Sequence, residues 1–298
     1  MRIDRSIFAG LDSLKLAAPL PTSGGRPGDR RSRARGRGVE LADFRPYTPG
    51  DDLRLVDWNV FARLEQVLVR LFHEDRDLSL LIVVDASASM SFGTPRKADH
   101  AAELAACLAF LALRQRDRVR VVVAGRRGTA SASAKGEHTG ALPLIVAALE
   151  RAEPDGVAEI ATTLAAEAER GRVDQAVLLT DLLVEPEERT MILRRLARIA
   201  GRPALLHVLG NEELTPDLSD GLVAIDAETG EELPTKGGRG ANKLYADELA
   251  RWRVEIEAQC RELNILYAPA FTTVPARILV GDDLRRRQVV LAARGGGR

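Results

Sequence analysis

Residues 78–90, Leu-Ser-Leu-Leu-Ile-Val-Val-Asp-Ala-Ser-Ala-Ser-Met, decide the fold class. The first seven are aliphatic except for one serine, and a run of this length and composition predicts a strand that is buried on both faces. The strand ends abruptly in Asp85, and Ser87 and Ser89 follow at alternate positions before a helical pattern begins near Arg96. Because ligands of an open α/β sheet gather outside the carboxyl ends of its strands, we expect a site in this loop.

The three polar side chains after the strand offer oxygen atoms only. One carboxylate and two hydroxyls are hard ligands, which suit Mg²⁺ or Mn²⁺ better than softer metals. The competing interpretation is that Asp85, Ser87 and Ser89 cap the free N–H groups of the next helix, as these residue types commonly do. Capping is the better explanation for each residue alone, whereas the spacing of all three directly after a buried strand favours the metal.

Further along the chain, apolar strands alternate with helical patterns. Because the strands are apolar on both faces and separated by helices, they predict a mostly parallel sheet with helices on both sides. An edge strand is expected at residues 128–134 and a small hairpin insertion at residues 221–234. The predicted strands are 118–124, 173–180, 204–209 and 264–268, and the predicted helices are 96–113, 140–151, 159–170, 187–200 and 242–263.

A second aspartate, Asp181, ends the strand predicted at residues 173–180. The ends of neighbouring parallel strands meet at one edge of a sheet, so we expect Asp181 to face the Asp85 loop and to hold the ion directly or through water. Mg²⁺ usually keeps several waters and accepts a carboxylate from an incoming partner. The metal site predicted from Asp85, Ser87, Ser89 and Asp181 therefore suits adhesion better than catalysis.

Two groups of residues resemble known families. Asp85-x-Ser87-x-Ser89 after a buried strand, with Asp181 after another, resembles the metal-ion-dependent adhesion site of von Willebrand factor type A domains. The stretch Arg45-Pro-Tyr-x-x-Gly-Asp-Asp-x-Arg54-x-x-Asp57-Trp58, followed by Ala62-Arg63, is similar to the signature of the bacterial family called domain of unknown function 58. This resemblance implies a three-layer, Rossmann-like type A fold and work beside a MoxR-type AAA+ ATPase as an adaptor in protein maturation.

One position departs from the type A pattern. The family places a Thr near the start of the helix before the Asp181 strand, and this chain has Ala158 there. Glu159, Thr162 and Thr163 are candidates to replace the missing ligand, and the spacing leaves the choice open. The loss of one hydroxyl ligand predicts weak ion binding, or binding that needs a partner.

The chain is expected to divide into an N-terminal extension of residues 1–77, a type A-like domain of residues 78–270 and a partly ordered tail of residues 271–298. Residues 3–20 have helix-like apolar spacing that two prolines end. Arg26 to Arg37 lie in a Gly- and Arg-rich loop of unassigned role.

The signature stretch is expected to be a structural loop. Arg–carboxylate pairs and a buried Trp58 would hold it, and a docking surface is the alternative.

Composition excludes several functions. Lys plus Arg equals Asp plus Glu, at 43 each, so the charge balance gives no argument for nucleic acid. No run of 18 apolar residues predicts a membrane span, and no signal peptide is evident. Cys107 and Cys260 have no metal-binding spacing and are expected to be buried thiols in a reducing compartment, which predicts a cytoplasmic protein.

No catalytic arrangement emerges from the sequence. The four histidines have no metal-ligand spacing, and His207 is expected to be a core residue. Phosphate-binding loops are absent as well. The alternative is a metal-dependent phosphohydrolase with Asp85 as nucleophile or ligand. It would need a second aspartate two residues on, where position 87 is Ser, or a nearby lysine. We therefore predict a non-enzymatic adaptor, whose partner and oligomeric state the sequence leaves open.

Overall fold

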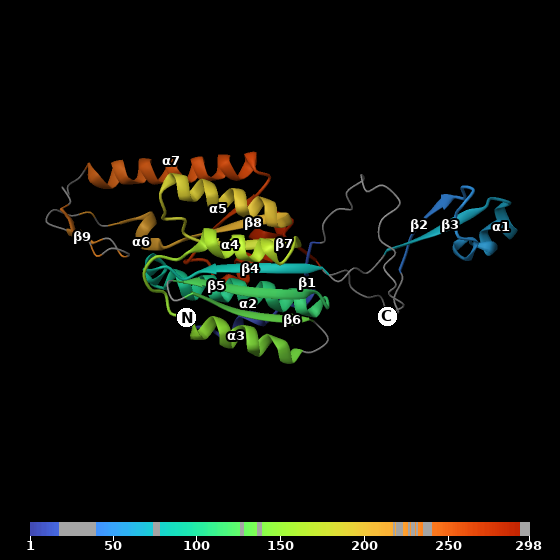
Figure 1. Cartoon of the computed structure of the whole chain (residues 1–298), viewed down its shortest axis with the longest axis horizontal. Helices are drawn as coiled ribbons and strands as arrows, with labels where there is room; N and C mark the ends of the chain where they lie inside the picture. Colours follow the sequence, from blue (N-terminus) through green and yellow to red (C-terminus); the bar gives the residue numbers. More distant parts are fainter. Residues whose placement is uncertain are drawn as a thin grey trace. The chain divides into compact units, whose positions relative to one another are not determined.

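The computed structural model describes residues 1–17, 40–73, 78–125, 128–135, 139–216 and 240–292, with residues 218, 223–225, 227, 230 and 232–234 between the last two ranges. The chain forms two compact units (Figure 1). The larger unit contains residues 1–20 and 78–298, and the smaller one residues 21–77. The Arg-rich loop from Arg26 to Arg37 lies outside the described residues.

A six-stranded sheet forms the centre of the larger unit, in the order β11-β8-β7-β4-β5-β6. All neighbours pair in parallel except β6, which is antiparallel to β5 at the edge. Counted along the chain, this order is 3-2-1-4-5-6, the order of doubly wound sheets. The strands are β4 (Ser79–Asp85), β5 (Arg118–Gly125), β6 (Gly128–Lys135), β7 (Val173–Thr180), β8 (Ala200–Leu209) and β11 (Leu266–Phe271).

Helices cover both faces of this sheet (Figure 1). The sheet therefore lies between two hydrophobic cores, one on each face. Successive side chains of a strand point to opposite faces, so Ile82 belongs to one core and Val83 to the other, and both are fully buried. This arrangement confirms the predicted three-layer, Rossmann-like α/β fold. Helices α2 (Lys97–Arg114) and α3 (Leu142–Arg151) line the first core, and α4 (Ile160–Glu169), α5 (Pro186–Ile199) and α7 (Ala241–Glu262) line the second.

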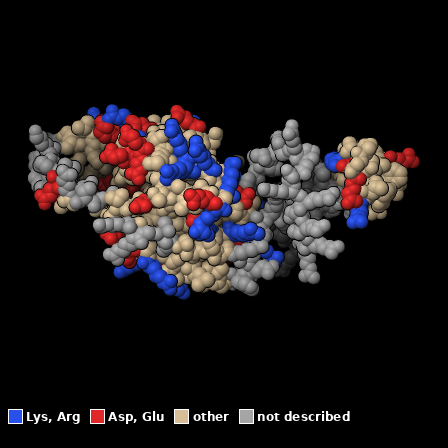
Figure 2. Space-filling model, in the orientation of Figure 1, with Lys and Arg blue, Asp and Glu red and all other residues tan. Residues whose placement is uncertain are grey.

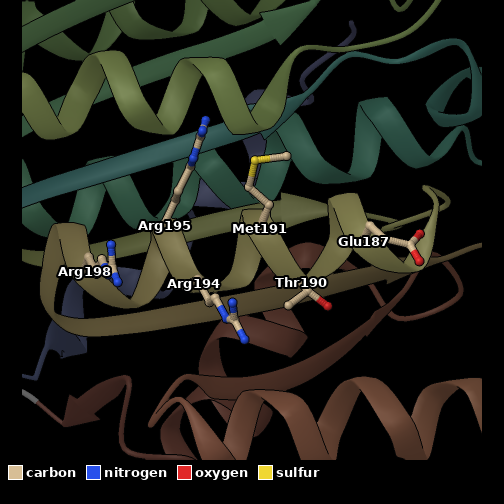
Figure 3. A pocket seen from close by; sticks show the side chains of 6 residues that line it. All are labelled: Glu187, Thr190, Met191, Arg194, Arg195 and Arg198. Carbon is tan, nitrogen blue, oxygen red and sulfur yellow. The ribbon is translucent and has the colours of Figure 1, made fainter.

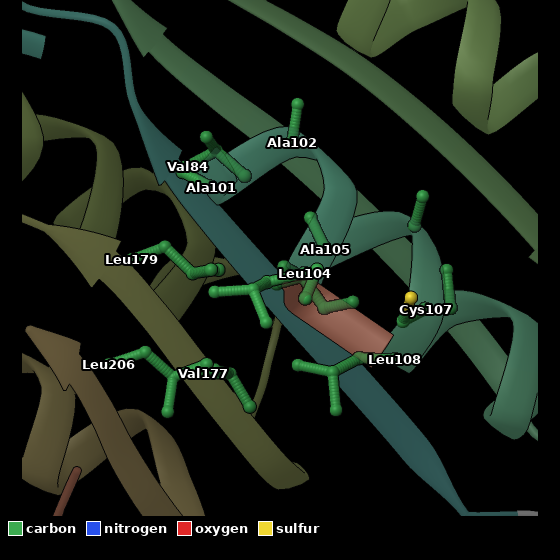
Figure 4. Close-up of a cluster of buried hydrophobic side chains, with 14 of the residues drawn as sticks. Val84, Ala101, Ala102, Leu104, Ala105, Cys107, Leu108, Val177, Leu179 and Leu206 are labelled. Carbon is green, nitrogen blue, oxygen red and sulfur yellow. The ribbon is translucent and has the colours of Figure 1, made fainter. Parts of the chain in front are cut away.

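Helix α2 is surrounded on all sides, with 14 of its 18 residues buried. Its many alanines allow close approach to the sheet, while Leu104 and Leu108 lie against Val84 and Val177 (Figure 4). Its remaining faces are covered by segments from both ends of the larger unit, whose side chains belong to the same core.

The N-terminal segment differs from the helix predicted at residues 3–20. It forms two 3₁₀ turns, η1 (Arg5–Phe8) and η2 (Leu11–Ser13), and a short strand, β1 (Leu14–Leu16). Gly10 between the turns has a φ of +82°, a left-handed conformation that interrupts a helix.

The segment after β11 is also more regular than the partly ordered tail that the sequence predicts. Described residues after β11 form α8 (Ala276–Ile278), the π-helical turn η6 (Leu279–Asp283), α9 (Leu284–Arg286) and β12 (Val290–Ala292). Strand β12 pairs with β1, and Leu279, Val280 and Leu284 are buried in the first core. Both end segments therefore belong to the larger unit.

Short elements complete the larger unit. They are η4 (Ala88–Ser91), η5 (Thr139–Ala141), α6 (Asn211–Leu214), β9 (Val223–Ile225) and β10 (Glu232–Pro234). All but η5, which follows the antiparallel β6, come after the carboxyl ends of parallel strands. Strands β9 and β10 pair in antiparallel fashion, which confirms the predicted hairpin, and the pairing of β5 with β6 confirms the predicted edge strand.

The smaller unit contains an antiparallel pair, β2 (Glu40–Pro46) and β3 (Leu68–His73), with η3 (Leu53–Leu55) and α1 (Trp58–Leu64) between them. Arg45 pairs with Asp51 through two hydrogen bonds of 2.7 Å, as predicted. The predicted burial of Trp58 is wrong: its exposure is 58%, and no residue of α1 is buried. Asp57 caps this helix at the backbone N–H groups of Asn59 and Val60.

Candidate functional site

The four predicted ligands lie at the carboxyl ends of two neighbouring strands. Asp85 ends β4, and Asp181 follows β7, which pairs with β4 in parallel. Ser87 and Ser89 follow in the loop and in η4, and none of the four residues is more than 8% exposed. We call Asp85, Ser87, Ser89 and Asp181 the edge cluster.

Hydrogen bonds hold the β4 half of the edge cluster together. The Asp85 carboxylate accepts the backbone N–H of Ser87, at 2.8 Å from N to Oδ1, and the hydroxyl of Thr180, at 2.6 Å from Oγ1 to Oδ2. The Ser87 and Ser89 hydroxyl oxygens lie 3.0 Å apart. None of these side chains caps α2, whose first residue is preceded by Arg96 without a side-chain cap. The capping interpretation is therefore wrong for this helix.

Asp181 bonds to a cation of its own chain. The ammonium of Lys97, in the first turn of α2, donates to Asp181 Oδ2 at 2.7 Å and also to a carboxylate oxygen of Glu213 in α6. The Lys97 side chain is fully buried. The other Asp181 oxygen accepts the backbone N–H of Leu183 at 3.2 Å. Asp181 thus joins the loop after β7 to α2 and, through Lys97, to α6.

Charge is unevenly balanced at this edge. Burial, and then the negative charge of Asp181, raise the pKa of Asp85 to about 7. Burial lowers the pKa of Lys97, but Asp181 and Glu213 outweigh it and leave that pKa above its ordinary value. Three carboxylates therefore face one ammonium, and when all are ionised the excess is two negative charges.

The edge cluster fits a hard divalent cation in donor chemistry and in charge. Within the described residues, no group of three or more His, Cys, Asp or Glu side chains is placed to hold a metal, so a site here depends on the Ser87 and Ser89 hydroxyls as well. Ala158 is buried and offers no side-chain ligand. No described hydrogen bond joins the candidate replacements to the edge cluster; Glu159 and Thr162 are exposed and Thr163 is buried.

His207 lies beneath the edge cluster and has a structural role. One ring nitrogen, Nε2, lies 3.0 Å from the backbone carbonyl oxygen of Asp181, and Nδ1 lies 2.9 Å from the hydroxyl of Tyr267. Burial lowers the pKa of His207 to about 4, so the ring is neutral at pH 7. The prediction of a core histidine is confirmed.

Three exposed apolar side chains lie on the loops that carry or adjoin the edge cluster. Phe92 follows η4, Val157 precedes α4 and Leu183 follows β7, with exposures of 52%, 48% and 47%. The backbone N–H of Ala88 donates to the carbonyl of Gly156 at 2.8 Å, which ties two of these loops together. We call Phe92, Val157 and Leu183 the apolar rim.

Lys97, Thr180, Glu213 and the apolar rim were not singled out from the sequence. Thr180 could have been found from its position, because its hydroxyl directly precedes the strand-end Asp181. Lys97 opens a helix, where a lysine is usually solvated, and its burial depends on how α2 packs.

A surface hollow lies elsewhere, on the outer face of α5 (Figure 3). Its volume is about 280 Å³, and it shares no residue with the edge cluster or the apolar rim. Its lining residues are Glu187, Thr190, Met191, Arg194, Arg195 and Arg198. Among the described residues, no helix has the length and apolar character needed to cross a membrane.

Solved structures with a similar chain course include BatB from Bacteroides thetaiotaomicron and a von Willebrand factor type A protein from Catenulispora acidiphila. BatB is 15% identical with a TM-score of 0.41, covering 70% of this chain and 98% of its own. The Catenulispora protein is 14% identical with a TM-score of 0.39, covering 74% of this chain and 43% of its own. The fold itself is identified by the strand order and pairing described above.

Sequence relatives give the family. Uncharacterized proteins of Mycobacterium bovis and Mycobacterium tuberculosis are 33% identical over 239 residues, which is 76% of this chain and 73% of theirs. A family described as "Protein of unknown function DUF58" matches residues 43–252. The chain belongs to the DUF58 family.

Proposed function

We propose that this chain is a non-enzymatic adaptor that binds a partner protein at the edge where β4 and β7 end. In this proposal the edge cluster holds Mg²⁺ or Mn²⁺, and the ion accepts a carboxylate from the partner. The observation that carries the proposal is a buried set of carboxylates and hydroxyls on the same loops as three exposed apolar side chains.

Each residue group has a distinct part in this mechanism. Ser87 and Ser89 offer neutral oxygens, and Asp85 offers charge, with its carboxylate oriented by Thr180. Lys97 fixes Asp181 and leaves it to act through its charge or through water. A bound dication would supply the positive charge that the site lacks. The apolar rim would add contact area around the ion, as exposed apolar patches do at protein interfaces.

The partner is proposed by family resemblance alone. It is a MoxR-type AAA+ ATPase, with which this chain would act in protein maturation in the cytoplasm. The two buried, free cysteines support a reducing compartment. The Thr180 hydroxyl bonds to the Asp85 carboxylate but is fully buried, where a substrate would not reach it, so binding is favoured over nucleophilic catalysis.

Calorimetric titration with Mg²⁺ and Mn²⁺ tests the ion. We expect wild type to bind and Ser87→Ala to bind about tenfold more weakly or worse, because it loses a proposed ligand. Ser91→Ala is the matched control, since Ser91 lies in the same η4 turn, is exposed and is outside the edge cluster. Equal binding by all three proteins, or no binding by wild type, would reject the ion site.

Capture of the proposed ATPase, with and without Mg²⁺, tests the docking face. We expect Asp85→Asn and Phe92→Ser each to reduce capture, the first by weakening the ion and the second by shrinking the apolar rim. If Phe92→Ser reduces capture and Asp85→Asn does not, the docking face is supported and the role of the ion is rejected. Phosphatase turnover with Mn²⁺ that disappears in Asp85→Asn would instead favour a hydrolase.

A further inference from the structure

The outer face of α5 carries three arginines toward its C-terminal end, with the acid Glu187 at the other end of the same hollow. Met191, Arg194, Arg195 and Arg198 recur at the spacing that places residues on one side of a helix. They line the hollow of about 280 Å³, and Met191 is 42% exposed (Figure 3). Basic side chains also gather over α5 on the molecular surface (Figure 2). We call these four residues the α5 stripe.

Two exposed arginines of α7 are paired with acids of their own helix. Arg251 pairs with Glu248 and Arg261 with Glu257 in α7, each about one turn apart. No such pair exists for the α5 stripe within the described part of the chain. Arg194 and Arg198 have no acidic residue three or four positions away on either side.

The arrangement is unfavourable for the isolated helix. Arg194 and Arg198 are four residues apart, and like charges at this spacing repel each other. The helix dipole favours Arg198 in the last turn but gives less support to Arg194, one turn earlier. Arg195 donates to the backbone carbonyl of Ala161 in α4, which holds it beside the hollow. A solvated surface would gain nothing from this repulsion.

We propose that the α5 stripe docks an acidic segment of a partner protein, which places an apolar side chain against Met191. Opposite charge would relieve the repulsion within the stripe, and the hollow would receive the apolar side chain. A protein segment suits the stripe better than nucleic acid because no aromatic side chain lines the hollow to stack on a base. This surface shares no residue with the edge cluster, so the inference stands apart from the proposed function.

Fluorescence anisotropy with a labelled acidic peptide of Glu, Ala and Leu tests the inference. We expect wild type to bind this peptide with an affinity that falls as salt is added. Wild type should not bind the same peptide with Lys in place of Glu. The charge-reversed variant Arg194→Glu/Arg198→Glu should bind about tenfold more weakly or worse. The matched control is Arg251→Glu/Arg261→Glu on α7, which changes the net charge equally and should bind like wild type.

A stability measurement separates lost binding from lost folding. The single change Arg194→Glu places an acid four residues before Arg198, an attractive orientation, so its thermal midpoint should equal or slightly exceed that of wild type. Weaker peptide binding by a variant of unimpaired stability would support docking. The inference fails if wild type does not bind the acidic peptide or if the α7 control loses as much affinity. It also fails if a thymidine oligonucleotide binds more tightly with the same dependence on the stripe.

Discussion

Lys97 places a fixed positive charge among the carboxylates at the edge of the sheet. Its ammonium is buried and lies between Asp181 and Glu213, so it neutralises charge that would otherwise be desolvated without a partner. An ion bound by the edge cluster would therefore meet Asp181 already paired, and would depend chiefly on Asp85, Ser87 and Ser89. This pairing is a second reason, besides Ala158, to expect weak ion binding.

Replacement of Lys97 by methionine tests that role. Lys97→Met keeps the length of the side chain but leaves two acids at a buried edge without their cation, and we expect it to lower the free energy of unfolding by about 3–5 kcal/mol. Urea denaturation measures the change. The control Arg251→Met breaks an exposed pair and should change stability by less than about 1 kcal/mol. A similarly small effect for Lys97→Met would show that its ion pairs contribute little.

Residue-level prediction from the sequence succeeded where local spacing decides the outcome. Asp85, Ser87 and Ser89 converge because they leave one strand at alternate positions, and His207 is buried because its strand is apolar on both sides. Lys97 was missed because its environment is made by residues distant in sequence. Whether the edge cluster holds an ion stays a prediction.

At the scale of elements, continuous apolar strands were the strongest signal. The central strands are covered on both faces, and burial on both faces removes the polar alternation that would mark a half-exposed strand. The weaker expectations failed for physical reasons. The apolar spacing of residues 3–20 also suits two short turns around Gly10, and Trp58 lies on a helix none of whose residues is buried.

The packing of α2 on the sheet predicts a large effect of truncation. Leu104→Ala removes a fully buried side chain between α2 and β4, and should lower the free energy of unfolding by about 2–5 kcal/mol. Leu144→Ala in α3 is the matched control because Leu144 is 65% exposed, and should change stability by no more than about 0.5 kcal/mol. Chemical denaturation compares them. Equal effects would contradict the packing of α2 described above.

At the scale of the whole molecule, buried histidines connect stability to pH. Burial lowers the pKa of His100 to about 4, and its Nε2 atom has no hydrogen-bond partner within the described structure. The unfolded chain binds a proton below about pH 6.5, whereas the folded chain resists it until about pH 4. His100 therefore favours unfolding increasingly as pH falls through this window.

The variant His100→Leu should lose less stability than wild type on acidification. Between pH 7 and pH 4 the difference between the two unfolding free energies should grow by up to about 3 kcal/mol, the value of a shift from 6.5 to about 4. Urea denaturation at several pH values measures that difference, in which contributions from other groups such as Asp85 cancel. If the unfolding free energies of the two proteins depended on pH equally, folding would not lower the pKa of His100.

The pairing of β1 with β12 joins the two end segments of the larger unit. Leu16 lies opposite Val290, and both side chains are buried, so each strand shields the inner surface of the other. A protease that trimmed residues 290–292 would also release residues 14–16 and expose the flank of α2. Loss of either strand would leave the other without its hydrogen-bonded partner.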